Sequence, residues 1–132
     1  MLGSRRSGCP IAISLDLFGD RWSLLIVRDL MFKGLCSFTQ FSAAGEGIAT
    51  NVLAERLERL EAAEIIERRP DPEDRRRGVY RLTRKGVDLA PVLVEMVIWA
   101  ARHGDTDAPP RQLREMTRHR ARFLAGVRKR LD

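Results

Sequence analysis

The sequence predicts a mainly α-helical fold of the α+β class, in which helices surround one two-stranded β-hairpin. Apolar residues recur at helical spacing in several segments of the chain. One pair of short β-branched segments flanks a stretch rich in Pro, Asp and Arg, as in a hairpin with a long tip. The length of 132 residues, with 44% hydrophobic side chains, is enough for one compact core.

Three short helices are expected in the first third of the chain. Pro10 opens an amphipathic helix that ends at Gly19. Asp20 can cap the next helix, the most buried of the chain, which ends near Gly34. Ser37 can cap a third helix, and a glycine-rich turn leads from it into the next element.

The fourth expected helix runs from Thr50 to about Ala62. Its leucines recur at steps of four and three residues, which places them on one face that points to the core. They are Leu53, Leu57 and Leu60. The opposite face is then exposed. On a helical wheel, the side chains outside or beside the leucine face are Thr50, Asn51, Ala54, Glu55, Glu58 and Arg59.

The hairpin is expected to follow this helix at once. Ile65–Glu67 and Val79–Leu82 are rich in β-branched and aromatic residues and form its strands. Between them, Arg68–Gly78 forms a long tip.

Two longer helices are expected after the hairpin. Thr83 can cap the first, which runs from about Arg84 to His103, bends at Pro91 and carries an apolar stripe that needs a partner. The second follows Pro110 as a single last helix with apolar residues among many arginines. This order of helices and hairpin is the layout of a winged helix-turn-helix, with the hairpin as the wing.

The composition favours a nucleic-acid partner and argues against several other classes. Lys and Arg number 24 against 18 Asp and Glu, which gives a net charge of +6 and a pI of about 10.3. Two separated cysteines do not make a disulfide scaffold or a zinc site, and they favour a reducing cytoplasm. The longest nearly apolar stretch is too short to cross a membrane. The two separated histidines imply no metal, and no cofactor is expected.

The exposed face of the Thr50–Ala62 helix is the candidate base-reading surface. Asn can bond adenine through two groups, Glu can accept from cytosine N4, and Ala can touch a thymine methyl group. The predicted base-reading residues are Thr50, Asn51, Ala54 and Glu55. A salt-bridged surface helix, in which Glu55 pairs with Arg59, is the alternative. Arg56 lies nearer the buried side and is expected to brace the helix through a carboxylate such as Asp29.

Most of the net charge lies in the hairpin region. Arg68 to Lys85 holds eight basic against three acidic residues. Its arginine-rich tip suits phosphates or a narrow minor groove, with a solvated loop neutralised by its own acids as the alternative. Hydroxyl and amide groups on the third helix also suit phosphates, with capping as their alternative role. The predicted phosphate or minor-groove contacts are Ser37, Thr39, Gln40, Arg59, Arg75, Arg76 and Arg77.

The sequence contains no recognisable enzyme motif. It lacks a GxxxxGK phosphate loop, a GxSxG elbow and an HExxH helix, so no catalytic residue is expected. The chief alternative to DNA binding is a protein-interaction module. In that case the chain pairs with a partner protein through Leu89–Ala101, and its arginines only keep it soluble.

Several motifs resemble the HxlR-type bacterial regulators over about Cys9 to His103. They are Cys9-Pro10, Leu17-Phe18-Gly19-Asp20-Arg21-Trp22, Leu25-Ile26-Val27-Arg28-Asp29-Leu30, Phe38-Thr39-Gln40-Phe41, Glu46-Gly47-Ile48-Ala49-Thr50-Asn51, Leu53 to Glu61, and Tyr80-Arg81-Leu82-Thr83-Arg84-Lys85-Gly86 with Pro91 and Trp99. The wing Asp71-Pro72-Glu73-Asp74-Arg75-Arg76 also resembles that of MarR-type regulators. The resemblance implies a cytoplasmic, homodimeric transcription factor that binds double-stranded DNA at a pseudo-palindromic operator, with Thr50–Glu61 in the major groove.

The resemblance also implies a dimer interface and a candidate sensor. The first helix and the Arg84–His103 helix would form the dimer through Ile11, Leu15, Leu93, Val94, Val97, Ile98 and Ala101. Cys9 matches the cysteine through which some members sense oxidants or electrophiles, and Arg5 and Arg6 are near enough in sequence to favour its thiolate. An oxidant or another small molecule is thus a candidate effector. An unreactive small apolar residue is the alternative for Cys9.

The expected organisation has three parts: a flexible basic N-terminus (1–8), the winged helix-turn-helix domain with its dimerisation helices (9–103) and a basic C-terminal helix (104–132). Ala49 stands where relatives often place a capping Ser, so Thr50 can take over the cap. Leu35 and Cys36 replace commonly basic residues. The segment from Arg111 holds eight basic against two acidic residues, and it either packs on the dimer or adds phosphate contacts.

Overall fold

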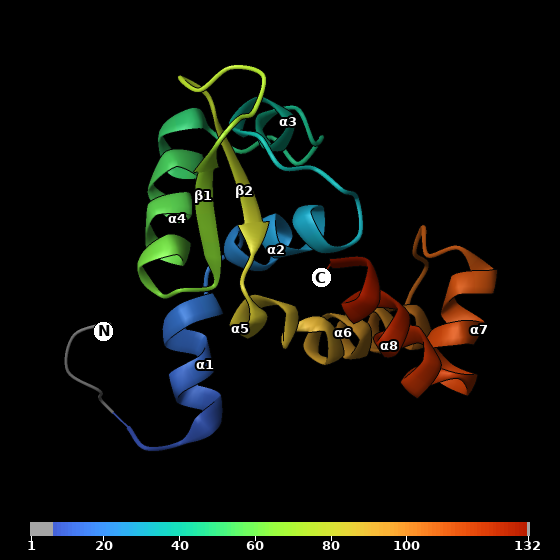
Figure 1. Cartoon of the computed structure of the whole chain (residues 1–132). Helices are drawn as coiled ribbons and strands as arrows, with labels where there is room; N and C mark the ends of the chain where they lie inside the picture. Colours follow the sequence, from blue (N-terminus) through green and yellow to red (C-terminus); the bar gives the residue numbers. More distant parts are fainter. Residues whose placement is uncertain (1–6, 132) are drawn as a thin grey trace. The chain divides into compact units, whose positions relative to one another are not determined.

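The computed structural model describes residues 7–131, which form helices and one antiparallel hairpin (Figure 1). They divide into two compact units, one ending at Gly86 and one beginning at Val87. The first unit contains α1 (Pro10–Phe18), α2 (Ser23–Met31), α3 (Phe38–Ser42), α4 (Thr50–Ala62), β1 (Ile66–Pro70) and β2 (Gly78–Leu82). The second contains α6 (Ala90–His103), α7 (Pro110–Arg118) and α8 (Arg120–Leu131), and the short α5 (Arg84–Val87) crosses the boundary.

The first unit is built around α2 and α4. Helix α4 packs against α3 and β1, while α2 packs against β2 and α1. The buried apolar side chains of these elements and of the turn before β1 are Ile26, Val27, Leu30, Met31, Phe41, Leu53, Leu57, Leu60, Ile65, Ile66 and Leu82. The leucine face of α4 is therefore buried as predicted, which leaves the other side of this helix exposed.

Helices α3 and α4 of this unit begin in different ways. Ser37 and Gln40 form a capping box at α3: the Ser37 hydroxyl accepts the Gln40 N–H, and the Gln40 side-chain carbonyl accepts the Ser37 N–H. Helix α4 differs, because Ala49 occupies its N-cap position and offers no side-chain bond. Thr50 is thus the first residue of α4 and does not take over the cap.

The hairpin has a longer first strand than the sequence predicts. Arg68 pairs with Tyr80 and Pro70 pairs with Gly78 in antiparallel register. The residues from Arg68 to Pro70, expected in the tip, therefore belong to β1. Their composition is typical of a loop, but a partner strand in register outweighs this local preference. Residues 71–77 alone form the tip.

Strand β2 also pairs with the segment before α3. Val79 forms an isolated antiparallel bridge with Ser37, and the Tyr80 N–H donates to the Cys36 carbonyl over 2.8 Å. The rings of Phe41 and Tyr80 lie 6.1 Å apart, centroid to centroid. The part of β2 next to the wing tip is thus attached to the start of α3.

The chain after the hairpin is divided more finely than predicted. The single helix expected over Arg84–His103 is two helices, α5 and α6, and Pro91 lies in the first turn of α6 and not within a continuous helix. Proline is favoured at that place because the first N–H groups of a helix have no partner within it. The single last helix is also two, since the backbone leaves helical geometry at His119, between α7 and α8.

The second unit has a small core of its own. Helix α6 packs against α7 and α8. The buried cluster and the half-buried side chains on it are Val94, Ile98, Met116, Val97, Leu113, Phe123 and Leu124. The boundary at Gly86 thus comes before α6, whereas the sequence groups this helix with the preceding domain. The three-part organisation stays a prediction, and its first part lies almost wholly outside the described residues.

Helix α6 carries apolar residues on two faces. Val94 and Ile98, predicted for the dimer interface, are buried within the chain because α6 packs against α7 and α8 on that side. Leu93, also predicted for the interface, is buried as well. The apolar side chains that α6 exposes are Val92 (46%), Met96 (51%) and Trp99 (66%). In the first unit, Ile11 and Leu15 of α1 are exposed as well. Within residues 7–131, no helix is both long and apolar enough to span a membrane.

Candidate nucleic-acid interface

The amino-terminal part of α4 presents the predicted base-reading residues to solvent. Thr50, Asn51, Ala54 and Glu55 are all exposed. Asn51 and Glu55 lie opposite Leu53 and Leu57, whose burial fixes the rotation of the helix, and Thr50 and Ala54 lie beside the leucine face. Because Ala49 takes the N-cap position, the Thr50 hydroxyl is not used there. This face has the exposure that an edge-reading helix needs in a major groove.

The tip of the wing presents three consecutive arginines. Arg75, Arg76 and Arg77 are exposed, and the Asp71 N–H closes the tip on the Arg77 carbonyl over 2.8 Å. Arg76 lies 3.6 Å from Asp74, and Arg77 lies 3.5 Å from Asp71. The arginine of each pair is exposed, and ion pairs at the surface contribute about 0 to 1 kcal/mol each, so a phosphate can replace the carboxylate as the arginine's partner at little cost. The acids of the tip are present, but they do not bury its arginines.

The predicted contacts on α3 are used in different ways. Ser37 and Gln40 are engaged with each other in the capping box, which is their alternative role. Thr39 is exposed on the same short helix. Of these three side chains, Thr39 is therefore the best placed for a phosphate.

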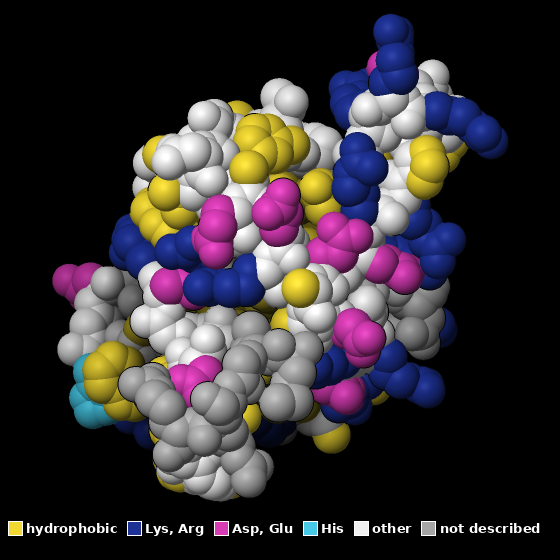
Figure 2. All heavy atoms as spheres, turned by 90° about the vertical axis from the view of Figure 1, so that its left-hand side faces the viewer, with side chains coloured by type: hydrophobic (Ala, Val, Ile, Leu, Met, Phe, Trp, Pro, Cys, Tyr) yellow, Lys and Arg dark blue, Asp and Glu magenta, His cyan; other side chains and the backbone are white. Residues whose placement is uncertain are grey.

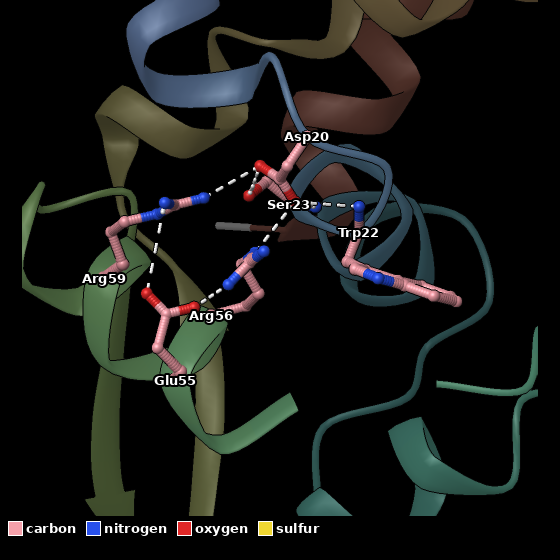
Figure 3. Close-up of polar contacts among 6 residues, drawn as sticks. All are labelled: Asp20, Trp22, Ser23, Glu55, Arg56 and Arg59. Atoms are coloured by element: carbon pink, nitrogen blue, oxygen red, sulfur yellow. Dashed lines mark hydrogen bonds and ion pairs between the residues drawn. The ribbon is translucent and has the colours of Figure 1, made fainter. Parts of the chain in front are cut away.

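Asp20 joins the start of α2 to the middle of α4 (Figure 3). One carboxylate oxygen accepts from the Trp22 N–H (2.8 Å), the Ser23 N–H (3.0 Å) and Arg56 Nε (2.9 Å). The other accepts from the Ser23 hydroxyl (2.6 Å) and Arg59 Nη2 (2.9 Å). Both arginines also approach Glu55: Arg56 forms an ion pair with it, and Arg59 Nη1 lies 4.0 Å from it.

This cluster bears on two expectations, one for the partner of Arg56 and one for the role of Arg59. Arg56 does brace α4, but its partner on α2's side is Asp20 and not Asp29. Arg59, predicted as a phosphate contact, is turned toward Asp20 and Glu55 within the protomer. The sequence signals Asp20 only as a helix cap, since nothing local shows that residues 36 and 39 positions further on meet it.

The hydrogen bonds keep Asp20 ionised. Burial disfavours the charged carboxylate, but the bonds from Ser23, Arg56 and Trp22 outweigh this effect and hold the pKa of Asp20 well below its usual range. One nitrogen, Arg59 Nε, is buried without a hydrogen-bond partner among the described residues. The cluster thus holds α2 and α4 together by ion pairs and leaves one hydrogen-bond donor without a partner.

A second ion pair steadies the turn before α4. Arg28 donates to the buried Asp29 over 2.8 Å and to Glu46 over 3.1 Å. Burial acts against the charged guanidinium, yet bonds to Asp29 and Glu46 raise the pKa of Arg28 above its ordinary value. Glu46 lies in the turn that precedes α4, between glycines of positive φ. Arg28 therefore links α2 to the turn that leads into α4.

Charge is divided between the helix and the wing. Figure 2 shows Lys and Arg side chains gathered on the projecting hairpin, and Asp and Glu side chains spread over the face on which α4 lies. Helix α4 itself has two arginines and three glutamates. The wing is the part of this unit that suits phosphates, and α4 is the part that suits base edges.

Cys9 lies apart from these side chains at the start of α1. Its thiol is free and exposed, it occupies the N-cap position of the helix, and its N–H donates to the Ser7 hydroxyl over 3.0 Å. Arg5 and Arg6, expected to favour its thiolate, lie outside the described residues. The geometry leaves the sulfur accessible to a reagent in solution.

Comparison with known proteins decides the family. A family model described as HxlR-like helix-turn-helix matches residues 17–108. The chain belongs to the HxlR-like helix-turn-helix family. The match begins in α1 and ends after α6, so it contains α4 and the wing, whereas α7 and α8 lie beyond it.

Proteins similar to this chain are named as HTH-type transcriptional regulators. YodB of Bacillus subtilis is 40% identical over 93 residues, which are 70% of this chain and 82% of YodB. A regulator of Synechocystis sp. is 41% identical over 88 residues, or 67% of this chain and 64% of that relative. The solved reduced form of B. subtilis YodB has a TM-score of 0.61 and 38% identity, covering 75% of this chain and 100% of YodB.

These findings confirm the predicted HxlR resemblance and the predicted winged helix-turn-helix fold. They also confirm, at the level of the family, the prediction of a DNA-binding transcriptional regulator. The roles of individual residues stay predictions.

Proposed function

We propose that this protein binds double-stranded DNA as a homodimer and regulates transcription from a pseudo-palindromic operator. The observation that carries the proposal is the pairing, within one compact unit, of an exposed α4 face with a hairpin tipped by three exposed arginines. A helix reads base edges in a major groove, while cations beside it fix the register on phosphates.

In this proposal α4 supplies the sequence preference. Asn51 is the chief reader, because its amide can donate to and accept from adenine at once. Glu55 can accept from cytosine N4, and its carboxylate is oriented by Arg56 and Arg59. Thr50 and Ala54 complete the contact surface. Arg75, Arg76, Arg77 and Thr39 hold the phosphate backbone, and Arg59 is left out of this set because it is paired within the protomer.

A second copy of the chain is the proposed occupant of the exposed apolar faces. Monomeric soluble proteins rarely leave neighbouring large apolar side chains on one helix in water. Trp99 and Met96 on α6, and Ile11 and Leu15 on α1, are exposed in this way in the single chain. A two-fold dimer would cover them and would present two α4 helices to two half-sites.

Selection of duplexes from a random pool by the purified protein tests the proposal. We expect an enriched inverted repeat with half-sites about one helical turn apart. Recovery of no motif by a folded, dimeric protein, whether untreated, reduced or oxidised, contradicts operator binding. It would favour a protein partner instead.

Replacement of Asn51 by Ala should relax the sequence preference at one base of each half-site. We expect a loss of about 1 to 3 kcal/mol of discrimination there, because a bidentate amide contact disappears. The salt dependence of binding should stay unchanged. Competition binding with operators altered at single positions measures the effect, with Glu61→Ala on the same helix as the control. An unaltered preference profile would exclude Asn51 as a base reader.

Oxidant sensing by Cys9 is the proposed regulation. YodB has been solved in a reduced, a quinone-bound and a diamide-treated form, and Cys9 of this chain is free and exposed. We expect peroxide to change the operator affinity of the wild type by about 5- to 150-fold, the usual range of coupling between two sites. Cys9→Ser should not respond, whereas Cys36→Ser should. Cys9 found oxidised by mass spectrometry with unchanged affinity would end the sensor hypothesis.

A further inference from the structure

We propose that Asp20 determines specificity by withholding the two arginines of α4 from DNA phosphates. The inference rests on the proposed DNA binding and adds to it a residue that does not touch DNA. Asp20 is a positioning residue in this account, since it acts through Arg56 and Arg59.

The geometry of the contacts between Asp20 and the two arginines supports this role. Arg56 and Arg59 are three residues apart, so they project from neighbouring positions on α4, and each bonds a different oxygen of Asp20 at 2.9 Å (Figure 3). The carboxylate is itself fixed by Ser23 and by the Trp22 N–H. Both guanidinium groups are therefore held toward the start of α2.

The pairing of the two arginines changes the charge that α4 exposes. With Arg56 and Arg59 paired, the exposed charges of the helix are its glutamates, among them Glu58 and Glu61. Such a face gains nothing from phosphates as such. It gains from a duplex only where base edges match its donors and acceptors.

Release of the arginines would let α4 bind phosphates as well as base edges. A guanidinium on α4 that is free to reach a phosphate adds affinity for every duplex, whatever its sequence. Loss of the tie to α2 would at the same time loosen the position of the base-reading residues. The ratio of operator binding to non-specific binding would therefore fall. Asp20 thus favours specificity over total affinity.

The test compares Asp20→Asn with Glu61→Gln, which removes one negative charge from α4 without releasing an arginine. Affinities for the selected operator and for a scrambled duplex are measured between 50 and 300 mM salt. For Asp20→Asn on the scrambled duplex, we expect the slope of log affinity against log salt to steepen by up to about 1.8 per protomer, or 0.9 for each freed arginine. Non-specific affinity should rise on the order of tenfold, and Glu61→Gln should show neither change.

Rescue separates this role from a purely structural one. Asp20→Asn combined with Arg56→Gln and Arg59→Gln should return the salt slope to the wild-type value. A mere brace would predict weaker binding to both duplexes and no steeper slope, and that result for a folded Asp20→Asn overturns the proposal.

A further variant decides the matter if Asp20→Asn does not fold. Arg56→Gln with Arg59→Gln, in a chain that keeps Asp20, should leave the wild-type salt slope unchanged. A slope flattened by about 1.8 per protomer would show that the arginines already contact phosphates, and it would overturn the proposal. A wild type that enriches no duplex would instead contradict the proposed function itself.

Discussion

Replacing Met96 and Trp99 together by Glu is expected to convert the protein from a dimer to a monomer. Both side chains are more than half exposed in the single chain, so a partner that covers them would have to bury two carboxylates without counterions. Operator affinity should fall by about 10² to 10⁴, because the second half-site contact ceases to be intramolecular. Analytical ultracentrifugation and operator titration measure the two effects.

The matched control places the same two charges elsewhere in the second unit. Ala121 and Ala125 are exposed on α8, and their replacement by Glu should leave the dimer intact. A Met96→Glu, Trp99→Glu variant that remains dimeric would move the interface away from this face of α6. If the α6 variant and the α8 variant dissociate equally, the cause is general charge repulsion and not the loss of a specific interface on α6.

Replacing Arg75, Arg76 and Arg77 by Ala should flatten the salt dependence of operator binding by up to about 2.7 per wing, or 0.9 for each phosphate released. Affinity near physiological salt should fall on the order of 100-fold for each wing by the same relation. The enriched motif should persist, since the proposed base contacts lie on α4. Titrations at several salt concentrations give the slope directly.

The control removes three positive charges from α7. Arg111, Arg114 and Arg118 are exposed there, outside the family match. If this segment only packs on the dimer and solvates its surface, their replacement by Ala should leave the slope unchanged. A flattened slope in the α7 variant would support phosphate contacts by the C-terminal segment. An unaltered slope in the wing variant would exclude the wing as a phosphate clamp.

The sequence predicts the elements whose signals are local. Helix α4 begins and ends where the leucine spacing places it, because Leu53, Leu57 and Leu60 leave only one face for the core. The break at His119 escapes prediction, since neither Gly nor Pro marks it. The length of strand β1 is underestimated because Arg68–Pro70 has residues typical of a loop, although the partner strand holds this segment extended.

The exposed residues of the candidate site can be predicted from the sequence, but the contacts between its helices cannot. Exposure of Asn51 follows from the wheel, and exposure of the wing tip follows from its composition. The meeting of Asp20 with Arg56 and Arg59 depends on how α2 and α4 pack, which no short motif encodes. The covered and open faces of α6 likewise depend on α7 and α8, because both faces are apolar in sequence.

The attachment of β2 to the start of α3 gives the first unit a mechanical property. Val79 bridges to Ser37, and the Tyr80 amide is held by the Cys36 carbonyl. If the wing tip binds a phosphate as proposed, a force on the tip acts through these contacts on α3, which packs against α4. Because these contacts lie next to the tip, little of β2 extends beyond its attachment to α3, and the strand resists bending. In the proposed complex, a duplex whose groove does not match the distance between the wing tip and α4 would therefore have to deform itself, since the protein side of the contact is stiff.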